Sequence, residues 1–277
     1  MIINGKQLAH EVSGRLEAQI TAAKKKLRLA IIMVGDDPRS LLFIKQKEKF
    51  AEMIGCTTRL YQLPTDISTQ KLRAKVSEIV RIPQNHGVIV QLPLPEGINE
   101  QSILNAIVPV KDVDVLSARA VGDAMVGTAK IESPIVAALK TILASGNVPG
   151  VGGMEVVVVG SGRLVGRPIA SWLIRESANV SILNKSVPDI SFYTKRADLV
   201  VMGAGVPRLL KGEMIKEGAI VIDAGTSESE GKIVGDVDAA SVSARASVFA
   251  PVPGGIGPLT VAMVFQNLVT LGIKKKK

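Results

Sequence analysis

Short apolar runs alternate with helical segments along this chain, and this alternation limits the possible folds more than any other feature. Residues 29–34 form a continuous apolar run that ends at the turn residues 35–38, as a buried strand would. Strand-like runs follow at 57–63 and 87–91, with a helical segment at 69–80 between them. The pattern therefore predicts βαβ units and a parallel sheet.

The first helices are indicated by spacing. Residues 7–26 carry apolar side chains at every fourth position from Leu8 to Ile20, which places them on one helical face. A second helix is expected from about Arg39, where Ser40 could cap it after Pro38.

A second array of the same kind begins near Gly150. The apolar run 156–159 is followed by glycines and then a helix through Trp172. Further strand-like runs lie at residues 180–183, 199–202 and 219–222. The chain has 277 residues, enough for two domains at about 150 residues each. We therefore expect two α/β domains, followed by a helix over 259–271.

Charge at first suggests a nucleic-acid partner, because the formal net charge is +9. Seven of the positive charges lie in the two lysine runs 24–26 and 274–277, so the rest of the chain is nearly neutral. Aromatic residues make up only 3% of the chain, which leaves little for stacking bases. We therefore expect no nucleic-acid partner and a solvated basic tail at 274–277.

Membrane, disulfide and zinc chemistry are also disfavoured. No apolar run reaches the roughly 18 residues of a membrane span, and the amino terminus lacks the basic-then-apolar order of a signal peptide. Cys56 is the single cysteine, and His10 and His86 are the only histidines, so no Cys or His cluster could hold zinc. The expectation is a soluble, cytoplasmic protein without a metal.

A glycine-rich turn marks a candidate nucleotide site. The run VVVVGSGRLVGRP places Gly160, Gly162 and Gly166 between a strand and a helix, where backbone amides and the helix end can hold a pyrophosphate. Gly160 would permit the tight turn, Gly162 would let the backbone approach the phosphates, and Gly166 would let the helix pack on the sheet. Such a pattern also occurs in ordinary βα turns, but its place in a βαβ array favours a dinucleotide.

The next strand bears on the choice of cofactor. Its tip is Asn184, Lys185 and Ser186, without the acidic residue that binds the ribose hydroxyls of NAD. A cation beside small polar side chains suits the 2′-phosphate of NADP. NADP is therefore favoured over NAD, and the alternative is that Lys185 is only a solvated loop residue.

Lysines in the second helix are candidates for acid/base chemistry. Phe43 and Lys47 lie one turn apart, so a ring and an ammonium group share one face. Lys45, Lys47 and Lys49 point in different directions, and only a partly buried lysine would have the lowered pKa that proton transfer requires. The spacing by itself does not choose among the three.

Polar groups also follow the strand at 87–91. In VIVQLPLP, Gln91 ends the strand and two prolines restrict the loop, which would aim a neutral amide beyond the strand ends. In PVKDVDV, Asp112 and Asp114 would lie on one side of an extended backbone. One of them could bind an amidine-like edge, or the pair could only cap a helix or carry surface charge.

Several motifs together resemble the bifunctional methylenetetrahydrofolate dehydrogenase/cyclohydrolase family. They are VGDDPRSLLFIKQK, VIVQLPLP, VKDVDV, VVVVGSGRLVGRP, GAIVIDAGT, VGDVD and PVPGGIGPLTVAM. The resemblance implies an αβα folate-binding catalytic domain at 1–122, completed by a returning helix at 259–273, and a Rossmann-type NAD(P)-binding domain at 123–258. It also implies a homodimer, tetrahydrofolate substrates and hydride transfer to NADP, followed by hydrolysis to 10-formyltetrahydrofolate.

The resemblance also assigns roles to residues. Lys47 corresponds to the family's cyclohydrolase lysine, Gln91 to the amide that works with it, and Asp114 to the carboxylate that anchors the pterin. The implied substrate-binding residues are Phe43, Val90, Leu92, Pro253, Gly254 and Gly255. The implied cofactor-binding residues are Gly160, Ser161, Gly162, Arg163, Val165, Gly166, Lys185, Ser186 and Thr226.

Some positions depart from the family pattern. Phe43 replaces a tyrosine, and Val115 begins a stretch where the family has Gly-Phe-His-Pro. In the cofactor loop Ser161 and the glycine after it replace Arg-Ser, while Asn184 and Lys185 replace His-Ser and could return a charge to the phosphate. These changes lie mostly on the cofactor side, so the dehydrogenase step is predicted less firmly than the hydrolase step.

Two alternatives follow from these departures. One is a non-catalytic relative that only binds a folate or nucleotide. The other is a different two-domain NADP oxidoreductase of the shikimate dehydrogenase type, against which the QLPLP and PVPGGIGP motifs argue.

Overall fold

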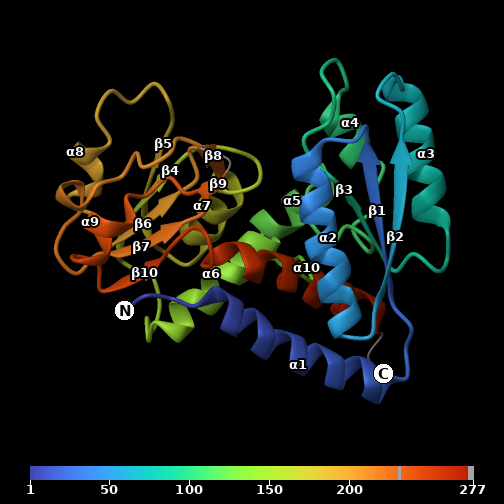
Figure 1. Ribbon diagram of the computed structural model, residues 1–277, viewed down its shortest axis with the longest axis horizontal. Helices are drawn as coiled ribbons and strands as arrows, with labels where there is room; N and C mark the ends of the chain where they lie inside the picture. Colours follow the sequence, from blue (N-terminus) through green and yellow to red (C-terminus); the bar gives the residue numbers. More distant parts are fainter. Residues whose placement is uncertain (230–231, 274–277) are drawn as a thin grey trace. The chain divides into compact units, whose positions relative to one another are not determined.

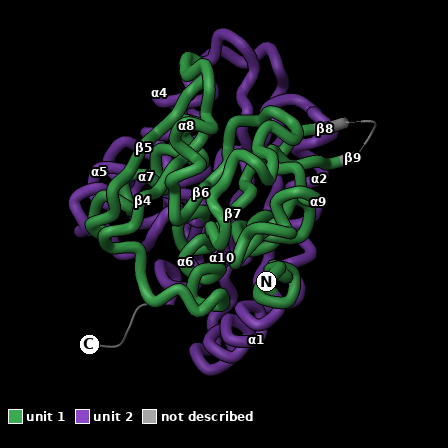
Figure 2. Tube along the Cα trace, turned by 90° about the vertical axis from the view of Figure 1, so that its left-hand side faces the viewer, with its two compact units in different colours: residues 1–9, 135–260 green, residues 10–134, 261–277 purple. Residues whose placement is uncertain are grey.

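The computed structural model describes residues 1–229 and 232–273, and the chain forms two compact units. Unit 1 comprises residues 1–9 and 135–260, and unit 2 comprises residues 10–134 and the chain from 261 onward (Figure 2). The basic tail expected at 274–277 lies outside the described residues.

Unit 2 is built on a three-stranded parallel sheet with the order β2-β1-β3 (Figure 1). Its strands are β1 (Arg28–Val34), β2 (Thr57–Leu63) and β3 (Gly87–Val90). Its helices are α2 (Pro38–Met53), α3 (Thr69–Arg81), α4 (Glu100–Leu104) and α5 (Ala118–Met125). The central strand β1 is buried from Leu29 to Val34, because α3 and α4 pack on one face through Ala30, Ile32 and the other side chains of that face.

Two further helices contribute residues to both units. They are α1 (Gly5–Ala23) and the carboxy-terminal helix α10 (Ile256–Gly272). Within unit 2, the ring of Phe265 in α10 stacks on the ring of Phe50 in α2, with 5.3 Å between centroids. A Cβ added at Gly87 of β3 would lie 2.8 Å from Cδ1 of Leu268, so α10 packs closely on this sheet. The carboxy-terminal helix therefore returns to the first domain, as expected.

Unit 1 contains a five-stranded sheet whose strands are all parallel, in the order β10-β7-β6-β4-β5. Its strands are β4 (Glu155–Val159), β5 (Asn179–Leu183), β6 (Leu199–Met202), β7 (Ile220–Asp223) and β10 (Val248–Ala250). Its helical elements are α6 (Pro134–Ser145), α7 (Gly166–Arg175), α8 (Ser191–Thr194), η1 (Gly212–Met214) and α9 (Ala239–Ser243). A small antiparallel pair, β8 (Ser227–Ser229) and β9 (Lys232–Val234), follows β7.

The strand order of unit 1 reverses at β4. The chain passes from β4 to its neighbour β5 and then crosses back to β6 on the other side of β4. In open α/β sheets, ligands bind beyond the carboxyl ends of the strands at such a switch point. The loops that follow β4 and β6 therefore occupy the position where a dinucleotide is expected.

The structure confirms the predicted two-domain α/β class with parallel sheets. The predicted strand at 57–63 and helix at 69–80 correspond to β2 and α3, with a difference of one residue in the helix. The strand β10 and the helix α9 were not predicted, because three and five residues are too few to show a strand or helix period.

One predicted cap is wrong. The carboxylate of Asp37, and not the hydroxyl of Ser40, caps α2, because it accepts the N–H of Ser40 at 2.8 Å. Pro38 occupies the first helical position, so the capping residue must precede it.

Candidate active site

Lys47 and Gln91, two of the predicted catalytic residues, are hydrogen-bonded within unit 2. Nζ of Lys47 in α2 donates to Oε1 of Gln91 at 2.9 Å. The main-chain N–H of Gln91 donates to the carbonyl of Ile32 in β1 at 2.8 Å, which continues the sheet past the end of β3. The side-chain amide of Gln91 also donates to the carbonyl of Leu92 at 3.0 Å. The hydrogen bonds of its main chain and of its side-chain amide therefore fix the direction of the Gln91 side chain.

The structure distinguishes among the three lysines of α2. Lys45 and Lys49 are exposed, whereas Lys47 is half-buried. Burial lowers the pKa of Lys47, and the nearby carboxylate of Asp114 opposes this change. Of the three lysines, Lys47 is therefore the one that the fold suits to proton transfer.

Asp114 comes near Lys47 because the segment before it runs beside β3. Asp112 forms a parallel bridge with Val88, and the N–H of Val88 donates to the carbonyl of Lys111 at 2.8 Å. Two residues further on, Asp114 follows the carboxyl end of the strand. Burial raises the pKa of Asp114 from 3.8 to about 6, the Lys47 ammonium opposes the rise, and the Asp112 charge adds to it. A lysine and a carboxylate of altered pKa thus share one site.

Asp112 has a different task from Asp114. Its buried carboxylate accepts the N–H groups of Leu116 at 3.1 Å and of Ser117 at 2.8 Å. Between these aspartate contacts, Val115 has a φ of 58°, in the left-handed region that β-branched residues rarely adopt. Asp112 therefore holds the turn that follows Asp114, and it caps no helix, because the cap of α5 is Ser117.

The predicted substrate-binding residues of unit 2 are neighbours of Lys47 and Gln91 along the chain. Phe43 is half-buried one helical turn before Lys47. Leu92 is half-buried and is joined to Pro93 by a cis peptide bond. The side chain of Val90 is 3% exposed and belongs to the hydrophobic core, so a substrate contact there would involve the main chain.

The glycine loop of unit 1 is closely packed at two of its three glycines. Gly160 has a φ of 106°, and an added Cβ would lie 2.1 Å from the carbonyl oxygen of Gly203. A Cβ at Gly166 would lie 1.8 Å from the carbonyl oxygen of Gly160. A Cβ at Gly162 meets nothing within 4 Å. Gly160 and Gly166 are thus required by the fold, whereas the open space at Gly162 suits a ligand that approaches the backbone.

The loop after β6 completes the switch point. A Cβ at Gly203 would lie 2.6 Å from Cγ1 of Val165, so the two loops pack together. The next two residues, Ala204 and Gly205, donate their N–H groups to Oδ2 of Asp236 at 2.6 and 2.9 Å. Asp236 therefore holds this loop in place, a role that sequence reasoning missed although it noted the VGDVD motif.

Asp223, at the end of β7, holds the segment that carries Asp236. Its carboxylate accepts the N–H groups of Gly225 at 3.0 Å, Asp236 at 3.1 Å and Val237 at 3.0 Å. Burial raises the pKa of Asp223 to about 6, and the neighbouring Asp236 charge acts in the same direction. Burial also raises the pKa of Asp236.

The polar tip of β5 lies next to the glycine loop. The N–H of Gly160 donates to the carbonyl of Leu183 at 2.7 Å, which joins the two strand ends. Asn184, Lys185 and Ser186 are exposed there, and Oδ1 of Asn184 accepts the N–H of Ser186 at 2.9 Å. The ammonium of Lys185 is therefore presented to solvent beside the loop.

The other predicted cofactor residues lie nearby in the sequence or at the end of β7. Ser161 is exposed, Arg163 is half-buried, and Thr226 is exposed beyond Asp223. Nε of Arg167, in the first turn of α7, donates to the carbonyl of Ser161 at 3.1 Å. Arg167 is thus a second cation of this loop, which the motif comparison did not single out.

The predicted substrate residues 253–255 belong to unit 1. Gly254 has a φ of 97°, and its carbonyl accepts the N–H of Gly5 at 2.8 Å. A Cβ at Gly255 would lie 2.4 Å from the carbonyl oxygen of Pro251. These glycines therefore have a structural reason to be small, and Pro253 precedes them through a cis peptide bond from Val252.

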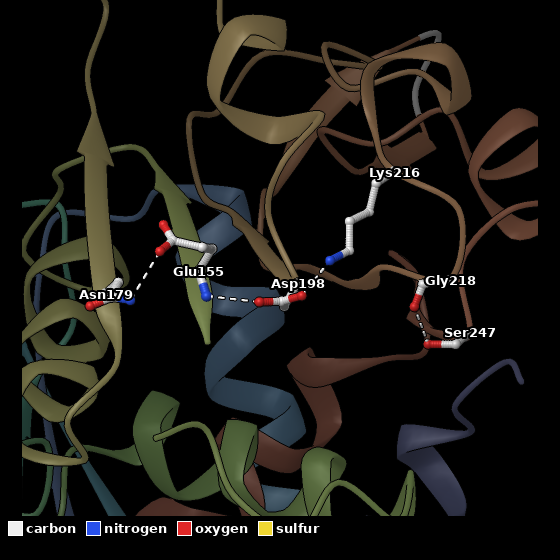
Figure 3. Close-up of polar contacts among 6 residues, drawn as sticks. All are labelled: Glu155, Asn179, Asp198, Lys216, Gly218 and Ser247. Atoms are coloured by element: carbon white, nitrogen blue, oxygen red, sulfur yellow. Dashed lines mark hydrogen bonds and ion pairs between the residues drawn. The ribbon is translucent and has the colours of Figure 1, made fainter. Parts of the chain in front are cut away.

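A depression of about 450 Å³ lies at the amino-terminal ends of the unit 1 strands. Its lining is formed by Gly152, Gly153, Met154, Asp198, Lys216, Gly218, Ile220 and Ser247. The Lys216 ammonium pairs with the Asp198 carboxylate, which also accepts the N–H of Glu155 at 2.8 Å (Figure 3). Because its cation is already paired and it lies away from the carboxyl ends of the strands, we do not assign the candidate site to it.

Residues 1–229 and 232–273 contain neither a metal-binding cluster nor a membrane-spanning helix. Within these ranges no group of three or more His, Cys, Asp or Glu side chains could hold a metal ion. No helix in the same ranges has both the length and the apolar character needed to cross a membrane.

Comparisons with known proteins agree with the geometry. Residues 3–114 match the catalytic domain of the tetrahydrofolate dehydrogenase/cyclohydrolase family, and residues 134–276 match its NAD(P)-binding domain. The bifunctional protein FolD of Desulfovibrio desulfuricans is 38% identical over 277 residues, which cover 97% of each chain. The bifunctional enzyme FolD, methylenetetrahydrofolate dehydrogenase/cyclohydrolase, of Campylobacter jejuni has a crystal structure with a TM-score of 0.94 and 35% identity, covering 98% of each chain. The Trypanosoma brucei methylenetetrahydrofolate dehydrogenase-cyclohydrolase, complexed with NADP cofactor and inhibitor, has a TM-score of 0.93 and 31% identity, covering 98% of this chain and 97% of that one.

Proposed function

Because the chain belongs to the tetrahydrofolate dehydrogenase/cyclohydrolase family, we propose that it oxidises methylenetetrahydrofolate with NADP and hydrolyses the methenyl product to 10-formyltetrahydrofolate. The observation that carries this proposal is that Lys47 is half-buried, donates a hydrogen bond to Gln91 and interacts electrostatically with Asp114. Family membership also favours this function over the shikimate dehydrogenase-like alternative.

The hydrolase step requires water to add to a cationic methenyl carbon. Lys47, whose pKa is lowered by burial, accepts a proton as the water oxygen bonds to that carbon. The hydroxyl proton of the adduct then reaches the ring nitrogen through Lys47 as the carbon–nitrogen bond breaks, and one proton passes to solvent. Gln91 keeps the Nζ atom in place by accepting its hydrogen bond.

Asp114 anchors the substrate in this proposal. An ionised carboxylate can accept two N–H groups from the amidine-like edge of a pterin. Although burial raises the pKa of Asp114 to about 6, this value stays below 7, so the ionised carboxylate is the main form at neutral pH. Phe43 supplies an aromatic ring one turn from Lys47 against which a flat pterin can pack.

The residues of unit 1 fit a dinucleotide. Gly162 leaves open space beside the backbone at the start of α7, a helix without a side-chain cap at its amino end. Lys185 and Arg167 provide positive charge near the loop, which suits a 2′-phosphate and favours NADP over NAD. When bound, NADP accepts the hydride released from the methylene carbon.

Replacement of Lys47 by alanine tests the hydrolase assignment. The Lys47→Ala variant should lose at least about a hundredfold in methenyltetrahydrofolate hydrolysis, because the proton carrier is removed. It should retain NADP-induced thermal stabilisation, because no cofactor residue changes. Lys45→Ala and Lys49→Ala, on exposed positions of the same helix, are matched controls that should keep wild-type rates.

The same assays distinguish an active enzyme from a non-catalytic relative. Wild-type protein that binds a folate but neither reduces NADP nor hydrolyses the methenyl substrate would identify a non-catalytic relative. Equal losses in the Lys47 and Lys45 variants would show that general helix damage, and not Lys47 chemistry, lowers the rate.

We also propose that the protein acts as a cytoplasmic homodimer with no nucleic-acid or membrane partner. The homodimer follows from the resemblance to the family. The small aromatic content and the confinement of excess charge to two lysine runs argue against a nucleic-acid partner. Light scattering should give twice the 29.2 kDa chain mass. A monomer mass, or retention on nucleic acid at physiological salt, would contradict this part of the proposal.

A further inference from the structure

A buried asparagine of α10 holds the segment that carries Asp114. Asn267 is 3% exposed, and its Nδ2 donates to the carbonyl of Val113 at 2.9 Å and to the carbonyl of Glu132 at 2.8 Å. Both hydrogens of the amide are therefore used, and the side chain cannot rotate without losing one buried and one partly buried hydrogen bond. Neither the motifs nor the resemblance pointed to this residue.

Val113 is the residue between the two aspartates, so the Asn267 bond acts at the centre of the site segment. The side chain of Val113 is fully buried against Gly87, where an added Cβ would lie 2.6 Å from Cγ1 of the valine. On the other side of Asp114, the carboxylate of Asp112 holds the turn through the N–H of Ser117. The main chain of Asp114 is thus fixed before it by Asn267 and after it by Asp112.

We propose that Asn267 is a positioning residue for substrate binding, acting through Asp114. This inference rests on the proposed function, since Asp114 anchors the pterin there. Without the Nδ2 donors, the carbonyl of Val113 loses a buried partner and the segment shifts to regain one. A carboxylate displaced by even a fraction of an ångström binds the amidine-like edge less well. The loss should therefore appear in substrate affinity more than in the hydrolysis of bound substrate.

The test is a double-mutant cycle with Asp114. Asn267→Ala should raise the KM for methenyltetrahydrofolate about tenfold and change kcat less than about threefold. In the Asp114→Asn background, the same alanine substitution should raise KM no further, because the group it positions is already lost.

Asn85 offers a matched control in the same unit. It is fully buried, and its Nδ2 donates to the carbonyl of Ile79 at 2.9 Å and to the Tyr61 hydroxyl at 3.3 Å. Asn85→Ala should lower stability in urea as Asn267→Ala does, yet leave the folate KM unchanged. If Asn267→Ala does not fold, Asn267→Ser, which keeps one donor, should give an intermediate rise in KM.

Each result has one meaning. Additive effects of the two substitutions, an unchanged KM in the Asn267 variants, or an equal rise in Asn85→Ala would overturn the positioning role and leave the proposed function intact. A wild-type protein that hydrolyses no methenyltetrahydrofolate would overturn both.

Discussion

The left-handed conformation of Val115 leads to a prediction with an unusual sign. Val115 has a φ of 58° and is 4% exposed, in a small cluster with Ala120 and Ile131. Its side chain thus contributes burial, while its backbone is strained. Replacement by alanine and by glycine separates these two contributions.

The magnitudes follow from the position. Val115→Ala removes two buried carbon atoms and keeps the strain, which should cost about 2 kcal/mol. A left-handed conformation costs an L-residue about 1–2 kcal/mol, and glycine avoids this cost. Glycine also loses one more buried methyl group and some backbone entropy. On balance we expect Val115→Gly to be as stable as Val115→Ala or more stable, by up to about 1 kcal/mol.

The same pair of substitutions at Val76 is the control. Val76 is fully buried in the ordinary helical backbone of α3, where glycine should be less stable than alanine by about 1 kcal/mol. The free energy of unfolding, measured in urea for the four variants, should show opposite orders at the two positions. If the free energy of unfolding of Val115→Gly is lower than that of Val115→Ala by as much as at Val76, the left-handed backbone at Val115 carries no strain.

Three other predictions concern unit 1. Gly166→Ala should abolish NADP-induced thermal stabilisation, because its Cβ would overlap the carbonyl of Gly160. Gly162→Ala should fold normally and bind NADP about tenfold more weakly. Equal effects of the two substitutions would refute the distinction. A folded pKa of about 6 at Asp223 means that the fold favours the protonated carboxyl. The stabilisation from this protonated carboxyl is fully present below about pH 4 and is lost as the pH rises through 6. The free energy of unfolding should therefore fall by about 1 kcal/mol from pH 5 to 7, and it should fall less in Asp223→Asn. Lys185→Ala should raise the KM for NADP about tenfold and leave that for NAD within about twofold; parallel changes for both cofactors would show that Lys185 does not meet the 2′-phosphate.

Local structure was predictable where one short segment contains the whole signal. The apolar run of β1 and the spaced apolar residues of α3 each show their period within a single element. The turn at Gly160 follows from glycine's conformational freedom, and its φ of 106° agrees. The predicted cap of α2, by contrast, was wrong by three residues. Asp37 and Ser40 are both good capping residues, and only the geometry at Pro38 distinguishes them.

The sequence by itself determined the fold class, the order of the longer strands and helices, and the family, because these depend on patterns read along the chain. Only the tertiary structure decided which groups act. Lys47 is half-buried whereas Lys45 and Lys49 are exposed, and burial in the fold lowers the pKa of Lys47. The tertiary structure also distinguishes the two aspartates. The carboxylate of Asp112 accepts backbone N–H groups four and five residues ahead, whereas that of Asp114 interacts with the charge of Lys47 from α2. Burial and charge are set by segments far apart in the sequence, and no local pattern contains them.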